Sequence, residues 1–165
     1  MDVDGVLHPV NARHTKPFDN KCMKCLKSIV DATHADICVT STWRLKPFEF
    51  KVLKQRLSAV GVQGVIGGTP VDAAGGRGEE IQIWLRANPD RMRAGYVVID
   101  DLDLAPNAPR HALLRGRVVR TDGKRGLVEA DVPRCIAAMG LAPPGLAGTA
   151  TAATTDASVQ VSQKS

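Results

Sequence analysis

Aromatic residues, cysteines and long apolar runs are scarce in this chain, and each scarcity excludes a class of function. Aromatic residues make up 4% of the 165 residues, too few for the stacking platform that binds single-stranded bases. No apolar run is long enough to span a bilayer, and the first residues do not resemble a signal peptide. We therefore expect no membrane association and a reducing, cytoplasmic compartment, in which the four cysteines stay free.

The cysteines raise the question of a zinc site. Cys22 and Cys25 form a C-x-x-C pair with His14 and His34 nearby, which is half of a zinc-binding pattern. No second pair stands at ligand spacing. Cys22 instead shares a helical spacing with the apolar residues Leu26, Ile29 and Val30. The cysteines are thus predicted to be small core residues.

Length and charge describe a single basic domain. The chain has 44% hydrophobic residues, enough for one domain with a sizeable core. Its formal net charge of +5 agrees with an anionic partner, such as a phosphate ester or nucleic acid. After residue 140 the composition changes to Ala, Thr, Pro, Gly and Ser with few charges. We expect a domain over residues 1–140 and a disordered tail over 141–165.

Helical and strand-like segments alternate along residues 1–140. Helices are predicted over residues 19–33, from Pro47 to Gly61, around 81–85 and over 128–139. Strands are predicted at residues 37–40, 62–66, 96–99 and 117–120. This alternation predicts an α/β fold, a three-layer Rossmann-like parallel sheet with helices on both faces. Functional sites of such sheets lie at the carboxyl ends of the strands.

The chain opens with a D-x-D-G-V-L string that suits phosphoryl transfer. Asp2 and Asp4 point the same way if Val3 continues a strand, because strand side chains alternate. Two such carboxylates can hold one magnesium ion while one of them attacks phosphorus.

Only Met1 precedes this string, although a string of this kind normally ends a buried apolar strand. The first strand therefore looks truncated. Either translation begins at Met1, or the start lies upstream and further apolar residues complete the strand. We favour the second alternative because the motifs downstream are intact.

Polar residues also follow the other predicted strands. Thr40 and Ser41 follow one strand, and Asp100 and Asp101 follow another. Adjacent carboxylates repel each other, so a bound cation is the simplest account of the acidic pair. Arg77 begins a predicted helix, where a cation is electrostatically disfavoured, and this favours a functional use. Thr40 and Ser41 have the alternative of simply ending their strand, and Arg77 that of a solvated helix start.

This ordered set resembles the haloacid-dehalogenase-like (HAD) superfamily of phosphohydrolases. Its four motifs are D-x-D, a strand-ending Thr or Ser, a Lys or Arg, and an acidic pair. Further landmarks resemble the branch found in Swiss Army knife RNA-repair proteins, and the likeness covers most of residues 2–140. These landmarks are the segments 41–44, 67–70, 77–81, 99–101, 119–122 and 126–127.

The resemblance implies a magnesium-dependent phosphatase with an aspartyl-phosphate intermediate. Asp2 would be the nucleophile. Asp4 would protonate the leaving alkoxide and then deprotonate the hydrolytic water. Mg²⁺ would be held by Asp2, by the main-chain carbonyl of Asp4 and by Asp100 or Asp101.

Other residues would contact the phosphoryl group or its surroundings. Thr40, with Ser41 as the alternative, would hydrogen-bond a phosphoryl oxygen, and Arg77 would stabilise the developing charge. Arg44 is a candidate substrate-binding residue together with Ser41, whereas Trp43 is expected to pack on the sheet. His8 is predicted to lie on the surface.

The spacing of the motifs leaves no room for an inserted cap domain between Asp4 and Ile37 or between Ser41 and Arg77. An open site suits a phosphate on a large substrate such as a nucleic-acid end, while small nucleotides stay an alternative. A second hypothesis is a catalytically inactive or truncated HAD-fold domain that acts as a binding module. The oligomeric state and the role of the tail stay open.

Overall fold

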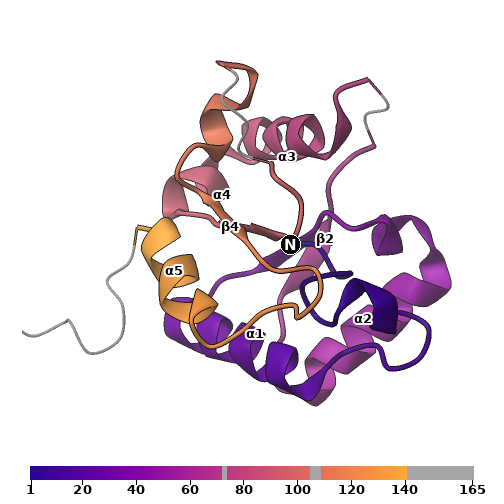
Figure 1. Ribbon diagram of the computed structural model, residues 1–165. Helices are drawn as coiled ribbons and strands as arrows, with labels where there is room; N and C mark the ends of the chain where they lie inside the picture. The colour runs from indigo at the N-terminus through magenta and orange to yellow at the C-terminus, as the bar shows by residue number, and fades with distance from the viewer. Residues whose placement is uncertain (72–73, 105–108, 141–165) are drawn as a thin grey trace, which may run out of the picture.

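The computed structural model describes residues 1–71, 74–104 and 109–140 of the chain, and the predicted tail lies outside them (Figure 1). Helices and strands alternate as expected for an α/β fold. In chain order the elements are η1 (Val10–Ala12), α1 (Asn20–Thr33), β1 (Ile37–Val39), η2 (Thr42–Leu45), α2 (Pro47–Ala59), β2 (Val65–Gly68), α3 (Gly76–Ala87), α4 (Pro89–Ala94), β3 (Val98–Asp100), η3 (Pro109–Leu114), β4 (Val118–Arg120) and α5 (Asp131–Ala138).

The first helix shows why local sequence predicts these elements well. The Asp19 side chain accepts hydrogen bonds from the main-chain N–H groups of Lys21 and Cys22 and so caps α1. The helix ends at His34, which adopts the left-handed conformation typical of such ends. Its buried face includes Cys22, which confirms that this cysteine is a core residue.

Two other elements differ from the expectation. Strand β2 begins at Val65, later than predicted from the apolar residues that start at Val62. Val62 is buried but lies in the turn after α2, so its burial is not that of a strand residue. Helix α4 was not predicted because its six residues include no residue that is buried. An apolar stripe is the main signal of a helix in a sequence.

The strands form two parallel pairs, β1 with β2 and β3 with β4. Residues Met1 and Asp2 lie between the pairs. The Met1 ammonium donates to the carbonyl of Cys38, and the Met1 carbonyl accepts from the N–H of Thr40, at 2.8 Å each. The N–H of Asp2 donates to the carbonyl of Ile99 at 2.9 Å. Two residues thus take the central strand position and join β1 to β3.

A cavity of about 260 Å³ lies beside Met1, between β1 and the segment that leads into β3. Most of its lining residues are apolar, and they come from β1, from the segment leading into β3, and from α1 and α3, including Leu26, Ile29, Ile37, Ile81 and Val97. Burial lowers the pKa of the Met1 ammonium, although the nearby Cys38, Asp100 and Asp2 partly offset it. The prediction of a truncated first strand stays untested.

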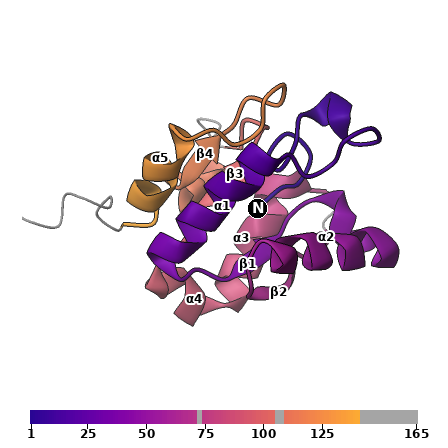
Figure 2. The same ribbon diagram turned by 90° about the horizontal axis from the view of Figure 1, so that it is seen from below.

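The helices pack into two apolar clusters. Helices α1 and α5 lie side by side and contact each other, as both views show (Figures 1 and 2). Together with α2 they contribute to the larger cluster, which holds Leu26, Leu53 and Cys135. Ile81 and Leu85 of α3 form a smaller cluster with Val98 and Leu114. No helix in the described part of the chain combines the length and the apolar character that crossing a membrane requires.

Candidate active site

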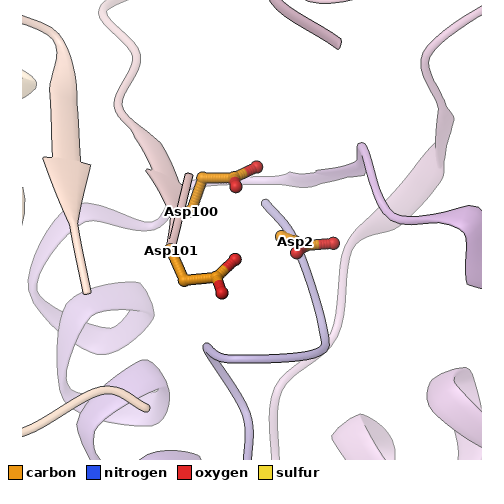
Figure 3. A group of neighbouring side chains, drawn as sticks. All are labelled: Asp2, Asp100 and Asp101. Atoms are coloured by element: carbon orange, nitrogen blue, oxygen red, sulfur yellow. The ribbon is translucent and has the colours of Figure 1, made fainter. Parts of the chain in front are cut away.

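Three carboxylates meet where the strands end. Oxygen atoms of Asp2, Asp100 and Asp101 all lie within 4.8 Å of one another. Figure 3 shows Asp100 and Asp101 extending from the end of β3 towards Asp2. The main-chain bond from Asp2 to Ile99 fixes this neighbourhood, because Ile99 immediately precedes the acidic pair. The prediction that Asp2 and the acidic pair converge agrees with this geometry.

Arg77 supplies the positive charge among these carboxylates. Its Nη1 lies 2.9 Å from Asp2 Oδ2, and 3.0 and 2.9 Å from the two carboxylate oxygens of Asp100. Burial by itself would lower the pKa of Arg77, but the charges and hydrogen bonds of Asp2 and Asp100 raise it. Arg77 lies in the first turn of α3. Its attraction to two carboxylates offsets the unfavourable helix dipole at that end.

One guanidinium does not fully neutralise three acids. Burial first, and then the charge of Asp2, raise the pKa of both Asp100 and Asp101. A raised pKa means that the site disfavours their ionised forms, and a bound cation would relieve this penalty. The donor set consists of carboxylate oxygens, which magnesium prefers.

Gly5 makes room for Asp101. It has a φ of +74°, and a Cβ added there would lie 2.6 Å from the Asp101 carboxylate carbon. The Gly5 carbonyl accepts a hydrogen bond of 2.7 Å from the Thr121 hydroxyl, which fixes the turn against the end of β4. The glycine of the D-x-D-G string therefore lets a carboxylate approach the main chain closely.

Two buried oxygen atoms beside the acids lack partners. Within the described residues, Asp2 Oδ1 and Thr40 Oγ1 have no hydrogen-bond partner. Buried polar atoms without partners are rare and call for an explanation, such as a bound ion or ligand. A phosphoryl group at Asp2 Oδ1 and a phosphoryl oxygen at the Thr40 hydroxyl would satisfy both atoms, and the three neighbouring carboxylates fit a magnesium ion.

The second carboxylate of the D-x-D string points into a different environment. Asp4 Oδ1 lies 3.0 Å from His8 Nε2, and Oδ2 accepts from the Trp43 indole N–H at 3.0 Å. Arg13 Nη1 lies 3.2 Å from Oδ2. Burial would raise the pKa of Asp4, but the hydrogen bonds from His8 and Trp43 and the charge of Arg13 lower it overall. The carboxylate of Asp4 is not part of the three-acid group.

Residues 1–132 match the family described as the HAD domain in Swiss Army Knife RNA repair proteins. The chain belongs to this family. The match confirms the resemblance found in the sequence and indicates a phosphohydrolase-type function. No curated protein matches the chain. No solved structure matches it either.

Within this HAD domain, Arg44 is occupied by the protein itself. Its Nε donates to the carbonyl of Thr69, Nη1 to those of Thr40 and Ser41, and Nη2 to Pro70 and the Glu80 carboxylate. These contacts use all five N–H donors of a guanidinium. The geometry favours a structural role for Arg44, which fastens the end of β1 to the end of β2. Its predicted contact with substrate stays untested.

Ser41 is buried at the end of β1, and its hydroxyl accepts from the Trp43 N–H at 3.5 Å, which caps η2. That bond leaves Thr40 as the residue whose hydroxyl has no protein partner among the described residues. Ser41 still has its own O–H to donate, so the choice between the two residues as the partner of a phosphoryl oxygen stays a prediction. The predicted role of Ser41 in substrate binding also stays untested.

The predicted surface position of His8 is wrong, and the contact of Arg13 with Asp4 was not predicted. His8 is 0% exposed, not a surface residue, because the chain turns back after Val3 and places it beside Asp4. The N–H of Leu7 donates to the carbonyl of Val3 at 2.8 Å, and the N–H of Gly5 donates to the main-chain carbonyl of His8 at 2.9 Å. A histidine four residues after an acid gives a signal only once this turn is known.

Proposed function

We propose that this HAD domain is a magnesium-dependent phosphohydrolase that works through an aspartyl-phosphate at Asp2. The observation that carries the proposal is the buried Oδ1 of Asp2, which has no partner among the described residues. The Thr40 hydroxyl has none either, and the Thr40 N–H donates to the carbonyl of Met1, the residue before Asp2. A nucleophile needs a free lone pair, and Asp2 keeps one while Arg77 binds its other oxygen.

Asp2, Asp100 and Asp101 would hold magnesium, together with the main-chain carbonyl of Asp4. When bound, the ion supplies positive charge that offsets the repulsion between the Asp2 carboxylate and a phosphate dianion. Arg77 pairs with Asp2 and Asp100 from the other side and keeps the nucleophile oriented. The Thr40 hydroxyl would donate to a phosphoryl oxygen, where charge builds up during transfer.

In the first step, an Asp2 carboxylate oxygen bonds to phosphorus while the bond from phosphorus to the leaving oxygen breaks. Asp4 gives its proton to that leaving oxygen. In the second step, water attacks phosphorus and Asp4 takes a proton from it. The phosphorus–oxygen bond to Asp2 then breaks, which releases phosphate and restores both carboxyl groups.

The lowered pKa of Asp4 suits its second role, in which it accepts a proton. Its first role requires the protonated form. An approaching phosphate dianion raises the pKa of a neighbouring carboxyl group, because like charges disfavour ionisation. Substrate binding would therefore favour the proton that Asp4 must donate.

Nucleic-acid ends are the proposed substrates, with nucleotides as the smaller alternative. A three-layer, capless arrangement is part of this proposal, because an open site admits the end of a polymer. In the described parts of the segments 5–36 and 42–76, the helices and strands belong to the α/β domain itself. The net charge of +5 favours an anionic polymer. The alternative of an inactive binding module has no such support from the site.

The test is release of phosphate from 4-nitrophenyl phosphate and from 5′- and 3′-phosphorylated oligonucleotides, with magnesium and with a chelator. We expect activity only with magnesium, and its loss in Asp2→Asn. Asp90→Asn is the matched control, because the Asp90 side chain is 91% exposed on α4. Activity in Asp2→Asn equal to that of the unmodified protein would refute the nucleophile. Absence of activity on every substrate would refute the function itself.

A further inference from the structure

His8 is the most buried polar partner of the proposed proton carrier. Its ring is 0% exposed, and its Nδ1 accepts a hydrogen bond of 3.3 Å from the Phe18 N–H. A ring nitrogen that accepts from an N–H carries no proton, so the proton of the neutral ring sits on Nε2. Nε2 therefore donates to Asp4 Oδ1, 3.0 Å away.

Trp43 donates a hydrogen bond to the other oxygen of the Asp4 carboxylate. Its indole N–H donates to Asp4 Oδ2 at 3.0 Å from a side chain that is almost fully buried. Three rings fix one another: Trp43 and Phe18 pack edge to face with centroids 5.4 Å apart, and His8 and Phe18 do so at 5.8 Å. Edge-to-face pairs are the favourable geometry for aromatic rings. Neither donor can swing away without disturbing this cluster.

Arg13 completes the set from the surface. Its Nη1 lies 3.2 Å from Asp4 Oδ2, and its guanidinium carbon lies 5.7 Å from the centroid of the Trp43 ring. Among the described residues, Oδ2 thus has two donors and Oδ1 has one. Each carboxylate oxygen has two lone pairs. Only Oδ1 keeps a lone pair on which a proton can be carried.

We propose that His8 and Trp43 are positioning residues that hold the Asp4 carboxylate in one orientation and make Oδ1 the atom that moves the proton. This inference rests on the proposed function, in which Asp4 serves the leaving group as an acid. It adds that the N–H donors of His8 and Trp43 determine how well the domain expels basic leaving groups. That property is measurable separately from activity as such.

The leaving group reveals the difference. A nitrophenolate is a weak base and departs without a proton, whereas the alkoxide of a nucleoside 5′-phosphate needs one. The value of kcat/KM includes steps only up to the first irreversible one, here formation of the aspartyl-phosphate. Hydrolysis of that common intermediate therefore drops out, and the ratio of kcat/KM for the two esters reports on proton donation.

The test compares this ratio in Trp43→Phe, which removes the indole N–H and keeps a ring, with the ratio in the unmodified protein. We expect kcat/KM for the nucleoside phosphate to fall about 10- to 100-fold, which is part of the roughly 100- to 10,000-fold that general acid catalysis contributes. For 4-nitrophenyl phosphate we expect a fall below about threefold. Phe18→Leu is the control, since Phe18 belongs to the same cluster and gives no side-chain bond to Asp4.

His8→Gln serves as the conservative variant, because a Gln amide keeps an N–H donor for Asp4 and is expected to keep the ratio. His8→Leu removes the donor and is expected to lower the ratio as Trp43→Phe does. Both esters are measured on one preparation, so the ratio is independent of how much of a destabilised variant is folded. Equal losses on both esters in Trp43→Phe and His8→Leu would overturn the inference. Unmodified protein without Asp2-dependent activity would instead overturn the proposed function.

Discussion

The strand layer has different surroundings at its two ends. The carboxyl end lies next to Asp2, and the amino end lies next to the Met1 ammonium. At the carboxyl end, Arg77 binds Asp2 and Asp100 at 2.9 Å, and Thr40 directly follows β1. At the amino end, the Met1 ammonium borders a largely apolar cavity of about 260 Å³. The carboxyl end therefore holds charged side chains, whereas the amino end is a cavity lined mostly by apolar side chains.

Short main-chain contacts position Asp2 at the carboxyl end of the strands. Three main-chain hydrogen bonds from Met1 and Asp2 to β1 and β3 locate the nucleophile. The turn that follows is fastened from outside, since the N–H of Leu127 donates to the carbonyl of Val6 at 2.8 Å and Thr121 binds Gly5. Neighbouring segments therefore hold the turn that carries the D-x-D-G string.

Arg77→Met should produce the largest effect, because it removes the cation that pairs with Asp2 and Asp100 at the carboxyl end of the strands. Breaking a buried ion pair leaves uncompensated charge, and with Arg77 20% exposed we expect a loss of about 2–4 kcal/mol in the free energy of unfolding without metal. We expect kcat/KM to fall about 100- to 1000-fold. Urea unfolding and phosphatase assays measure the two effects, and magnesium should restore part of the stability.

Arg86→Met is the matched control for this change. Arg86 lies on the same helix, is 55% exposed and pairs with Glu79 at 3.0 Å. Exposed pairs contribute little, so we expect a change below about 1 kcal/mol and unchanged activity. Equal effects of the two substitutions would mean that Arg77 is an ordinary surface cation.

Gly5→Ala should have the next largest effect, because it adds a methyl group next to the Asp101 carboxylate. The new methyl group would lie 2.6 Å from the Asp101 carboxylate carbon, at a φ of +74°. We expect a loss of about 2–3 kcal/mol in the free energy of unfolding, from backbone strain and displacement of Asp101. Gly116→Ala separates the two causes, because Gly116 has a similar φ of +70° but a Cβ added there would meet no atom within 4 Å. We expect about 1 kcal/mol there, and an equal loss at both positions would show that Asp101 moves freely.

The sequence predicted most of the longer elements and the acidic residues, because both depend on short-range patterns, whereas it missed α4, which buries no residue. The capped start of α1 at Asp19 and the apolar run before Asp100 are visible in the sequence itself. The partners of Asp4 are not, because Trp43 is 39 residues away and reaches it through the fold. The Arg44 contacts with Thr69 and Glu80 also span a distant loop, so its internal role had no local signal.

Filling the cavity next to Met1 with apolar side chains should stabilise the domain moderately. We expect an N-terminal extension of four β-branched apolar residues to continue the strand from Met1 into the cavity. Burial of apolar side chains is largely offset by the entropy of ordering them, so the expected gain in the free energy of unfolding is about 1–2 kcal/mol. Urea unfolding measures the gain. Cys38 lines the cavity and is half-buried, so its alkylation by a thiol reagent should slow as well.

An extension of four alternating Gly and Ser residues is the control, since it lengthens the chain without apolar side chains. We expect it to leave both stability and alkylation unchanged. If the apolar extension gave no more protection of Cys38 than this control, the cavity would not accept a strand. Phosphatase activity should change little with either extension, because the carboxyl end is held by other contacts.

Acetylation of the Met1 amine should give the smallest effect and isolates the charge at the amino end. The folded protein lowers the pKa of this amine below its ordinary value of 8.0, with burial as the main cause. The unfolded chain therefore binds more protons between the two pKa values, so stability rises with pH in that window and levels off above pH 8. One proton gives a slope of at most about 1.4 kcal/mol per pH unit. The acetylated protein lacks this titration, so the difference in free energy of unfolding between the two forms should shrink as the pH rises from 6 to about 8. A difference independent of pH would show that the ammonium is solvated and that the amino end is less dry than its lining indicates.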